Sequence, residues 1–218
     1  MTDITEVLST NTAAVVEQAL IAFGAGMALQ SRNDVKTSFQ FASRVASKLY
    51  DQEGQGEIWF KQFLKVMQDC GWVTVRRSYE KEQSATQSLK VGAIAFKAVS
   101  AVGTAVLGGP IGTAMTKLAG DALGKLGLVE GASALLNRNV KGYQSANIGL
   151  ASCLETSDGE VVMSMSAVNT DKSAHDLDAA VFEWSSKSEA MYSGVAVLSF
   201  NKALYEKVRE TIETKLGD

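Results

Sequence analysis

Nineteen consecutive residues, 98–116 (AVSAVGTAVLGGPIGTAMT), carry no charged side chain, and Lys97 and Lys117 border them. Water solvates such a segment poorly, so it must pack inside the protein or enter a lipid bilayer. Its large apolar side chains are few: Val99, Val102, Val106, Leu107, Ile111 and Met115. Most of the other residues are alanine, glycine and threonine, each of which buries little apolar area. This segment restricts the possible folds more than any other part of the chain.

The sequence Gly108–Gly109–Pro110 interrupts the segment. Proline cannot continue a helical hydrogen-bond ladder, and glycine adopts dihedral angles closed to other residues. We therefore predict a helical hairpin with Gly108, Gly109 and Pro110 as its hinge. After the hinge, small residues recur at every fourth position: Gly112, Thr116, Gly120 and Gly124. This spacing lets two helices approach closely, so we expect close approach at the three glycines.

Two interpretations of the hairpin compete. In the first, it is a permanent central layer, surrounded by the N-terminal helices, the C-terminal strands and the last helix. In the second, it is stored there and released to a bilayer. Each arm of about 17 residues reaches ~25 Å, which is slightly shorter than the ~30 Å hydrocarbon core of a bilayer. Lys97, Lys117 and Asp121 would each cost about 2.5–3.5 kcal/mol at the centre of the membrane. Glycine also destabilises a water-soluble helix by about 1 kcal/mol relative to alanine. The segment is therefore tolerated both inside a folded protein and in lipid without being optimal for either, which a protein that refolds at a membrane requires.

Composition and charge narrow the class of protein. Hydrophobic residues make up 46% of the 218 residues and charged residues 21%, which favours a folded core over disorder. The net charge is −3, and no dense basic face is present, so we expect no nucleic-acid partner. Cys70 and Cys153 are too few for a disulfide framework and are expected to be buried. The acidic N-terminal segment lacks the pattern of a cleaved signal peptide, so we expect synthesis in the cytoplasm, with any export by a non-classical route.

The first 85 residues are predicted to be mostly helical. Apolar residues recur at helical spacing over about 10–29, from Asn33 or Asp34 to about residue 49, and over 57–71, with DQEGQG as a break. The sequence WVTVRRSY at 72–79 then changes to β-branched and aromatic residues, which predicts a strand.

From about residue 146 the apolar period changes to two. Four strands are predicted, over 148–154, 160–168, 177–184 and 190–200, with short connections that favour an antiparallel meander. In the second strand, Val161, Met163, Met165 and Ala167 share a face. An apolar stripe then predicts an amphipathic helix over 200–216. The prediction is a single α+β domain over 1–218: helices and one strand (1–85), the hydrophobic hairpin (86–145), then a meander of four to five strands and a terminal helix (146–218).

The chain contains no pattern typical of an enzyme. His175 lies beside Asp176 and Asp178 and near Ser173, but adjacency in sequence does not define a catalytic triad, so we interpret it as a loop histidine. The glycines at 120–127 have the wrong spacing for a phosphate-binding loop and lack its hydroxyl residue. No metal-ligand spacing is present either. We therefore expect a protein that is not an enzyme and that uses no metal or cofactor.

Residues 91–127 resemble the buried hydrophobic hairpin of pore-forming toxins of the colicin kind. The resemblance is one of composition and assigns no functional residue, and the C-terminal meander departs from that all-helical family. Small α+β cytolysins, with a sheet flanked by helices, are another analogue without matching motifs. The resemblance implies a membrane-active effector that folds in water until it meets lipid, and the +3 charge of residues 91–145 agrees with that. The alternative is a self-assembling module, or a binder of apolar ligands, whose hairpin stays buried.

Overall fold

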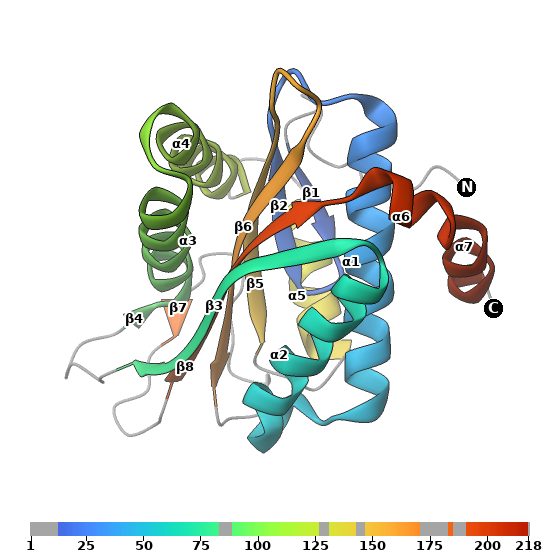
Figure 1. Cartoon of the computed structure of the whole chain (residues 1–218). Coiled ribbons are helices and arrows are strands. Elements are labelled where there is room, and N and C mark those ends of the chain that lie inside the picture. The colour runs from blue at the N-terminus through green and yellow to red at the C-terminus, as the bar shows by residue number, and fades with distance from the viewer. Residues whose placement is uncertain are drawn as a thin grey trace.

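A six-stranded sheet forms the centre of the molecule, with helices on both of its faces (Figure 1). The computed structural model describes residues 13–82, 89–126, 131–142, 147–170, 183–184 and 191–217. The predicted α+β class is confirmed. The sheet is larger than the predicted meander, and it is mixed, because one of its strand pairs is parallel.

Across the sheet the strands are β1 (Ala13–Val16), β2 (Ala19–Phe23), β5 (Ile148–Glu155), β6 (Val161–Thr170), β8 (Met191–Phe200) and β3 (Trp72–Glu82). A separate pair joins β4 (Leu89–Lys90) to β7 (Glu183–Trp184). The helices are α1 (Leu29–Leu49), α2 (Gln52–Asp69), α3 (Val91–Leu107), α4 (Gly109–Leu126), α5 (Ala132–Gly142), α6 (Lys202–Glu206) and α7 (Arg209–Gly217).

The predicted meander is confirmed in part. Strands β5, β6 and β8 are antiparallel neighbours, and Gly159, in the turn between β5 and β6, has φ +84°. Strand β8 pairs on its other side with β3, which extends the strand predicted at 72–79 to Glu82. The strand predicted at 177–184 does not join this meander, because Glu183 and Trp184 pair with β4 instead. Residues 177–182 lie outside the described residues.

The helix predicted over about 10–29 is wrong for the described part of that range. Strands β1 and β2 form an antiparallel hairpin that turns at Glu17, whose φ is +50°. Every residue of both strands is buried. The sequence therefore shows short apolar runs without alternation, and such runs fit a helical period equally well.

Strand β2 continues into the sheet by pairing in parallel with β5, which places Ala19 beside Gly149. A Cβ atom at position 149 would lie 2.7 Å from the Cβ of Ala19. The absence of a side chain at Gly149 therefore permits this pairing.

The helices around the sheet differ from prediction at their boundaries. The predicted break DQEGQG lies mostly inside α2, because the chain leaves the helix at Tyr50–Asp51 and α2 begins at Gln52. The single helix predicted over 200–216 is instead α6 and α7, separated at residues 207–208. The side chain of Asn201 caps α6 by accepting a hydrogen bond from the N–H of Leu204 at 3.1 Å.

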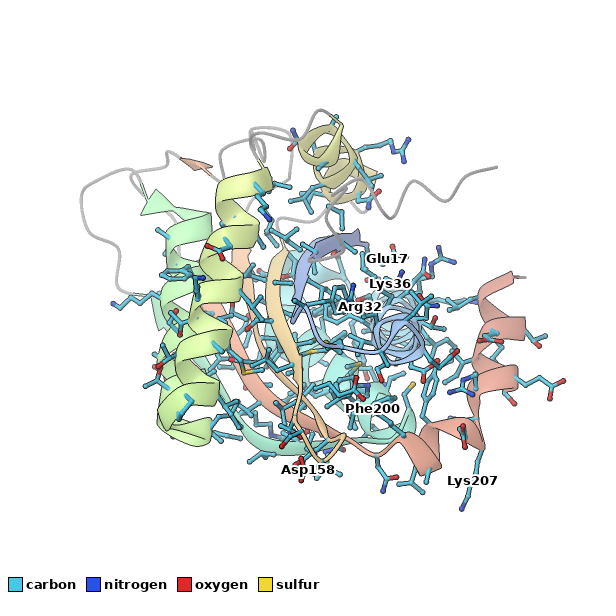
Figure 2. The ribbon with its side chains drawn as sticks, turned by 90° about the horizontal axis from the view of Figure 1, so that it is seen from above. Glu17, Arg32, Lys36, Asp158, Phe200 and Lys207 are labelled. Atoms are coloured by element: carbon cyan, nitrogen blue, oxygen red, sulfur yellow. The ribbon has the colours of Figure 1, made fainter. Side chains whose placement is uncertain are left out.

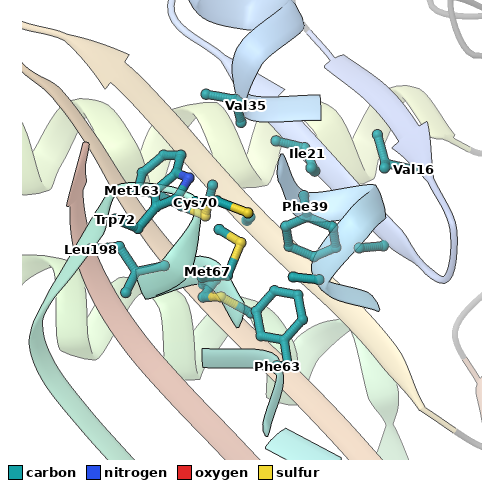
Figure 3. Packing of buried hydrophobic residues seen from close by; sticks show 14 of the residues in the cluster. Val16, Ile21, Val35, Phe39, Phe63, Met67, Cys70, Trp72, Met163 and Leu198 are labelled. Carbon is teal, nitrogen blue, oxygen red and sulfur yellow. The ribbon is translucent and has the colours of Figure 1, made fainter. Parts of the chain in front are cut away.

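Helices α1 and α2 cover one face of the sheet with a core rich in aromatic rings (Figure 3). The ring of Phe63 lies 5.0 Å from that of Phe39 and 5.5 Å from that of Trp59. The ring of Trp72 stacks on that of Phe200 at 4.5 Å. The β6 residues predicted to share a face all belong to this core: Val161, Met163, Met165 and Ala167. We call this side of the sheet the aromatic face.

Ion pairs hold the C-terminal helices on the same side of the molecule. Arg209 of α7 donates to both carboxylate oxygens of Asp34 in α1, at 3.2 and 2.8 Å. Lys202 of α6 pairs with Glu155 at the end of β5, which also accepts the backbone N–H of Ala28 at 2.8 Å. Burial works to raise the pKa of Glu155, but the hydrogen bonds from Lys202 and Ala28 and the charge of Lys202 outweigh it, so the pKa is lowered.

Candidate functional site

Helices α3 and α4 form the predicted hairpin on the opposite face of the sheet. In Figure 2 they lie on one side of the sheet and α1 lies on the other. Gly108 and Gly109 have φ angles of +59° and +42°, in the left-handed region that favours glycine. Pro110 follows in the first turn of α4, where its missing N–H leaves no helical hydrogen bond unmade. The three predicted hinge residues therefore make the turn between the helices.

The predicted close approach of the two helices is found at Gly112. A Cβ atom there would lie 2.9 Å from the Cα of Thr104 and 3.1 Å from the carbonyl oxygen of Gly103, both backbone atoms of α3. The other two glycines differ. Gly120 also faces α3, but a Cβ atom there would make only ordinary contact, at 3.4 Å, with the ring of Phe96 in α3. The expectation for Gly124 is corrected, because a Cβ atom there would have nothing within 4 Å. These two positions do not require glycine for the packing of α3 on α4.

We expect Gly112→Val to destabilise the protein by about 1–3 kcal/mol, because the added side chain would push α4 away from the backbone of α3. The matched control is Gly124→Ala, which places a methyl group in open space on the same helix and should stabilise the protein by about 1 kcal/mol. Denaturant unfolding measures both changes. Equal effects at the two positions would contradict the packing described here.

The sheet covers only one side of the hairpin. Val99, Val102 and Met115 are buried, whereas Val106, Leu107 and Ile111, near the hinge, are half-buried. The opposite side of the two helices is exposed at Ala101, Thr104, Ala105, Thr113, Lys117 and Asp121. The expectation that other elements surround the hairpin is therefore wrong, because α1, α2, α6 and α7 lie beyond the other face of the sheet. Among the described helices, none is both long and apolar enough to cross a membrane.

The sheet surface beneath α3 and α4 is rich in serine, and we call it the serine face. Ser164 and Ser166 of β6 donate hydrogen bonds of 3.0 Å to the backbone carbonyls of Val99 and Ala95 in α3. Gly103 allows the helix to lie this low, because a Cβ there would be 3.3 Å from the hydroxyl of Ser164. Ser152 is also buried, and its hydroxyl has no hydrogen-bond partner within the described ranges.

The two faces of the sheet differ in the side chains that pack against their helices. The buried part of the hairpin-side cluster consists of alanine, valine, leucine and isoleucine, without an aromatic ring among the residues described. Aromatic rings and long methionines fill the other core. Sequence reasoning missed the serines under α3, although they alternate with Met163 and Met165 in VVMSMSAV and so mark a second covered face.

The two cysteines add no reactive group to this site. His175 lies outside the described residues. Cys70 and Cys153 are buried free thiols. Burial, with a contribution from Asp69, raises the pKa of Cys70 to about 12, and burial also raises that of Cys153. Both thiols are therefore protonated and unreactive at neutral pH. Within the ranges that the structure describes, no group of histidine, cysteine and carboxylate residues could hold a metal ion.

Comparisons with known proteins give distant structural likenesses. No protein-family model and no curated protein matches the sequence. A solved structure titled delta-endotoxin is similar with 10% identity and a TM-score of 0.41, over 86% of this chain and 85% of that chain. The structure of the Evf virulence factor is similar with 11% identity and a TM-score of 0.28, over 95% of this chain and 87% of that one. These neighbours are named as a toxin and a virulence factor, and at these values the likeness assigns no function.

Proposed function

We propose that the protein is a non-enzymatic, membrane-active effector whose α3–α4 hairpin separates from the sheet at a lipid surface. The observation that carries this proposal is the difference between the two faces of the sheet. Small aliphatic side chains and serine hydroxyls hold the hairpin, whereas packed aromatic rings hold α1 and α2.

Releasing the hairpin from the sheet should cost less free energy than releasing α1 and α2. Fully burying one valine or methionine side chain stabilises a fold by about 1.5–3 kcal/mol, and in a bilayer the hairpin would bury Val99, Val102 and Met115 again. Release would uncover serines, which water solvates well, and also the buried apolar side chains of Leu20, Ile148 and Leu150, whose exposure costs free energy. Opening the aromatic face would instead leave large apolar residues of the sheet in water, among them Trp72, Met163 and Leu198.

Charge supports an encounter with an anionic surface. Lys97 and Lys117 are exposed at the ends of the uncharged segment, and a lysine near an anionic membrane contributes about 1 kcal/mol of attraction. Both side chains can stay at the lipid–water interface while the residues between them enter the hydrocarbon.

A disulfide that fastens α3 to β6 tests the proposal. A Cβ at position 103 would lie 3.5 Å from the Cβ of Ser164, which is within the range of natural disulfides. We expect Gly103→Cys/Ser164→Cys to lose dye release from anionic liposomes when oxidised and to regain it on reduction, at a pH between 4 and 8 where the parent protein is active. The buried native thiols, with their raised pKa values, should not compete for the bond.

Each single cysteine variant, treated with the same oxidant, is the control and should release dye before and after reduction. Full activity of the oxidised double variant would show that the hairpin need not leave the sheet. Absence of leakage from the parent protein across this pH range, together with self-association in sedimentation, would favour an assembly module with a permanently docked hairpin.

A further inference from the structure

On the same side of the sheet as the hairpin, a cleft of about 420 Å³ lies between α3 and strands β3 and β8. Small apolar side chains of α3, among them Ala98, Ala101 and Ala105, form one wall. Residues of β3 and β8 form the floor, where Ser78 pairs with Val195 and Glu80 pairs with Ser193 in the strand register. The cleft is therefore apolar along the helix and polar along the strands, the usual character of a small-molecule site.

Two cationic side chains line the cleft, Arg76 from β3 and Lys97 from α3. Both are exposed, and neither forms an ion pair with another residue that the structure describes. Glu80 lies four residues along β3 from Arg76, which is about 13 Å in an extended strand. The end of the cleft at Arg76 is therefore positive and suited to an anionic group.

A buried hydroxyl in the same cleft lacks a partner. Ser193 is 4% exposed, and its hydroxyl makes no hydrogen bond to any of the residues described. An unsatisfied buried hydroxyl is unfavourable, and a bound molecule that hydrogen-bonds to it would gain affinity. The missing hydrogen-bond partner of Ser193 is therefore a separate observation in favour of a bound ligand, in addition to the alanines and the two cations.

We propose that this cleft binds a small anionic amphiphile, with its phosphate or carboxylate group between Arg76 and Lys97. Its apolar body lies along the alanines of α3 and over Val195. Ser193 pairs with Glu80, about 13 Å along β3 from Arg76, so it would bond a second polar atom at the far end of the ligand, whereas dodecyl phosphate tests the charged end and the apolar body. The volume is within the range of small-molecule pockets. The site exists while the hairpin is docked, so the inference does not rest on release of the hairpin.

Isothermal titration calorimetry of the full chain with dodecyl phosphate, below its critical micelle concentration, tests the proposal. We expect one molecule to bind per chain. Arg76→Gln and Lys97→Gln should each weaken binding about tenfold, because each removes a charge-assisted contact. Arg77→Gln is the matched control: it removes the same charge from the next residue of β3, whose side chain points to the other face of the sheet, and should change Kd less than twofold.

Further titrations show whether the cleft needs both the charge and the apolar chain, and whether its anionic ligand is a free amphiphile or a lipid headgroup. Dodecanol, which has the chain without the charge, and inorganic phosphate, which has the charge without the chain, should both bind much more weakly than dodecyl phosphate. The protein could instead bind anionic phospholipid vesicles and not monomeric dodecyl phosphate. If Arg76→Gln weakens that vesicle binding and Arg77→Gln does not, a lipid headgroup is the occupant. Equal effects of Arg76→Gln and Arg77→Gln, or no binding of either probe, would overturn the proposal.

The oxidised Gly103→Cys/Ser164→Cys protein separates this inference from the proposed function. It should bind dodecyl phosphate as tightly as the parent, because the disulfide holds α3 where the cleft needs it. We therefore expect the oxidised protein to lose dye release and to keep its binding of dodecyl phosphate. Dye release tests the proposed function, and binding tests the proposed cleft.

Discussion

Replacing Trp72 with alanine is expected to lower the free energy of unfolding by about 3–5 kcal/mol, the range for removing a large buried aromatic side chain. Trp72 is 2% exposed, its ring stacks on Phe200, and its Nε1 donates a 3.0 Å hydrogen bond to the hydroxyl of Ser38 in α1. The substitution leaves a cavity where β3, β8 and α1 meet. Urea unfolding followed by circular dichroism measures the change.

A comparison of two methionines controls for the size of the deleted side chain. Met67 of α2 and Met115 of α4 are both completely buried, but Met67 lies among the sulfur and aromatic side chains of Figure 3. Alanine at either position should cost about 2–5 kcal/mol, with Met67 in the upper half of the range and Met115 in the lower half. A larger loss at Met115 would mean that the hairpin is held more tightly than the aromatic face and would remove the main support for hairpin release.

Arg209→Met should destabilise the protein by about 3 kcal/mol and release α7 from α1. The side chain of Asp34 is 5% exposed and that of Arg209 is 26% exposed, and removing one partner of a buried ion pair leaves a charge that neither water nor protein compensates. Gln30 still donates to Asp34 at 2.8 Å, which limits the loss. The measurement is urea unfolding, together with the rate of proteolytic cleavage near residue 207.

Lys61→Met is the control for the loss of a lysine or arginine charge. Lys61 pairs with Glu57 at 2.7 Å, but both side chains are more than half exposed, so the loss should stay below about 0.5 kcal/mol. The double variant Asp34→Asn/Arg209→Met should recover part of the stability, because no buried charge remains without a partner. Equal losses for Arg209→Met and Lys61→Met would show that the pair with Asp34 does not hold α7 in place.

The hairpin could be predicted because its signals are local. An uncharged run interrupted by Gly108, Gly109 and Pro110 permits few structures other than two helices and a tight turn. Strands β5, β6, β8 and β3 were also predicted, since alternation or β-branched residues mark them in the sequence. The contact at Gly112 could not be distinguished from Gly120 and Gly124, because the three share one sequence pattern and differ in how closely α3 approaches α4 at each position.

The remaining features depend on tertiary contacts. Ala13–Val16 and Ala19–Phe23 are strands because the sheet buries them on both faces, and nothing near them in sequence specifies that the neighbour of β2 is β5. The cleft could not be predicted for the same reason, since Arg76, Lys97 and Ser193 come from three different elements of the fold, β3, α3 and β8. A pattern search examines spacing within a segment and does not detect such a set.

The parallel pairing of β2 with β5 determines when the fold can close during synthesis. The ribosome completes α1 and α2 long before β5, β6 and β8 emerge, so Phe39, Phe60 and Phe63 initially have no sheet to cover. Contacts between such distant segments form slowly, and the nascent chain exposes an aggregation-prone surface while it waits. Efficient production of this protein should therefore depend on chaperones that shield α1 and α2 until β5, β6 and β8 have been synthesised.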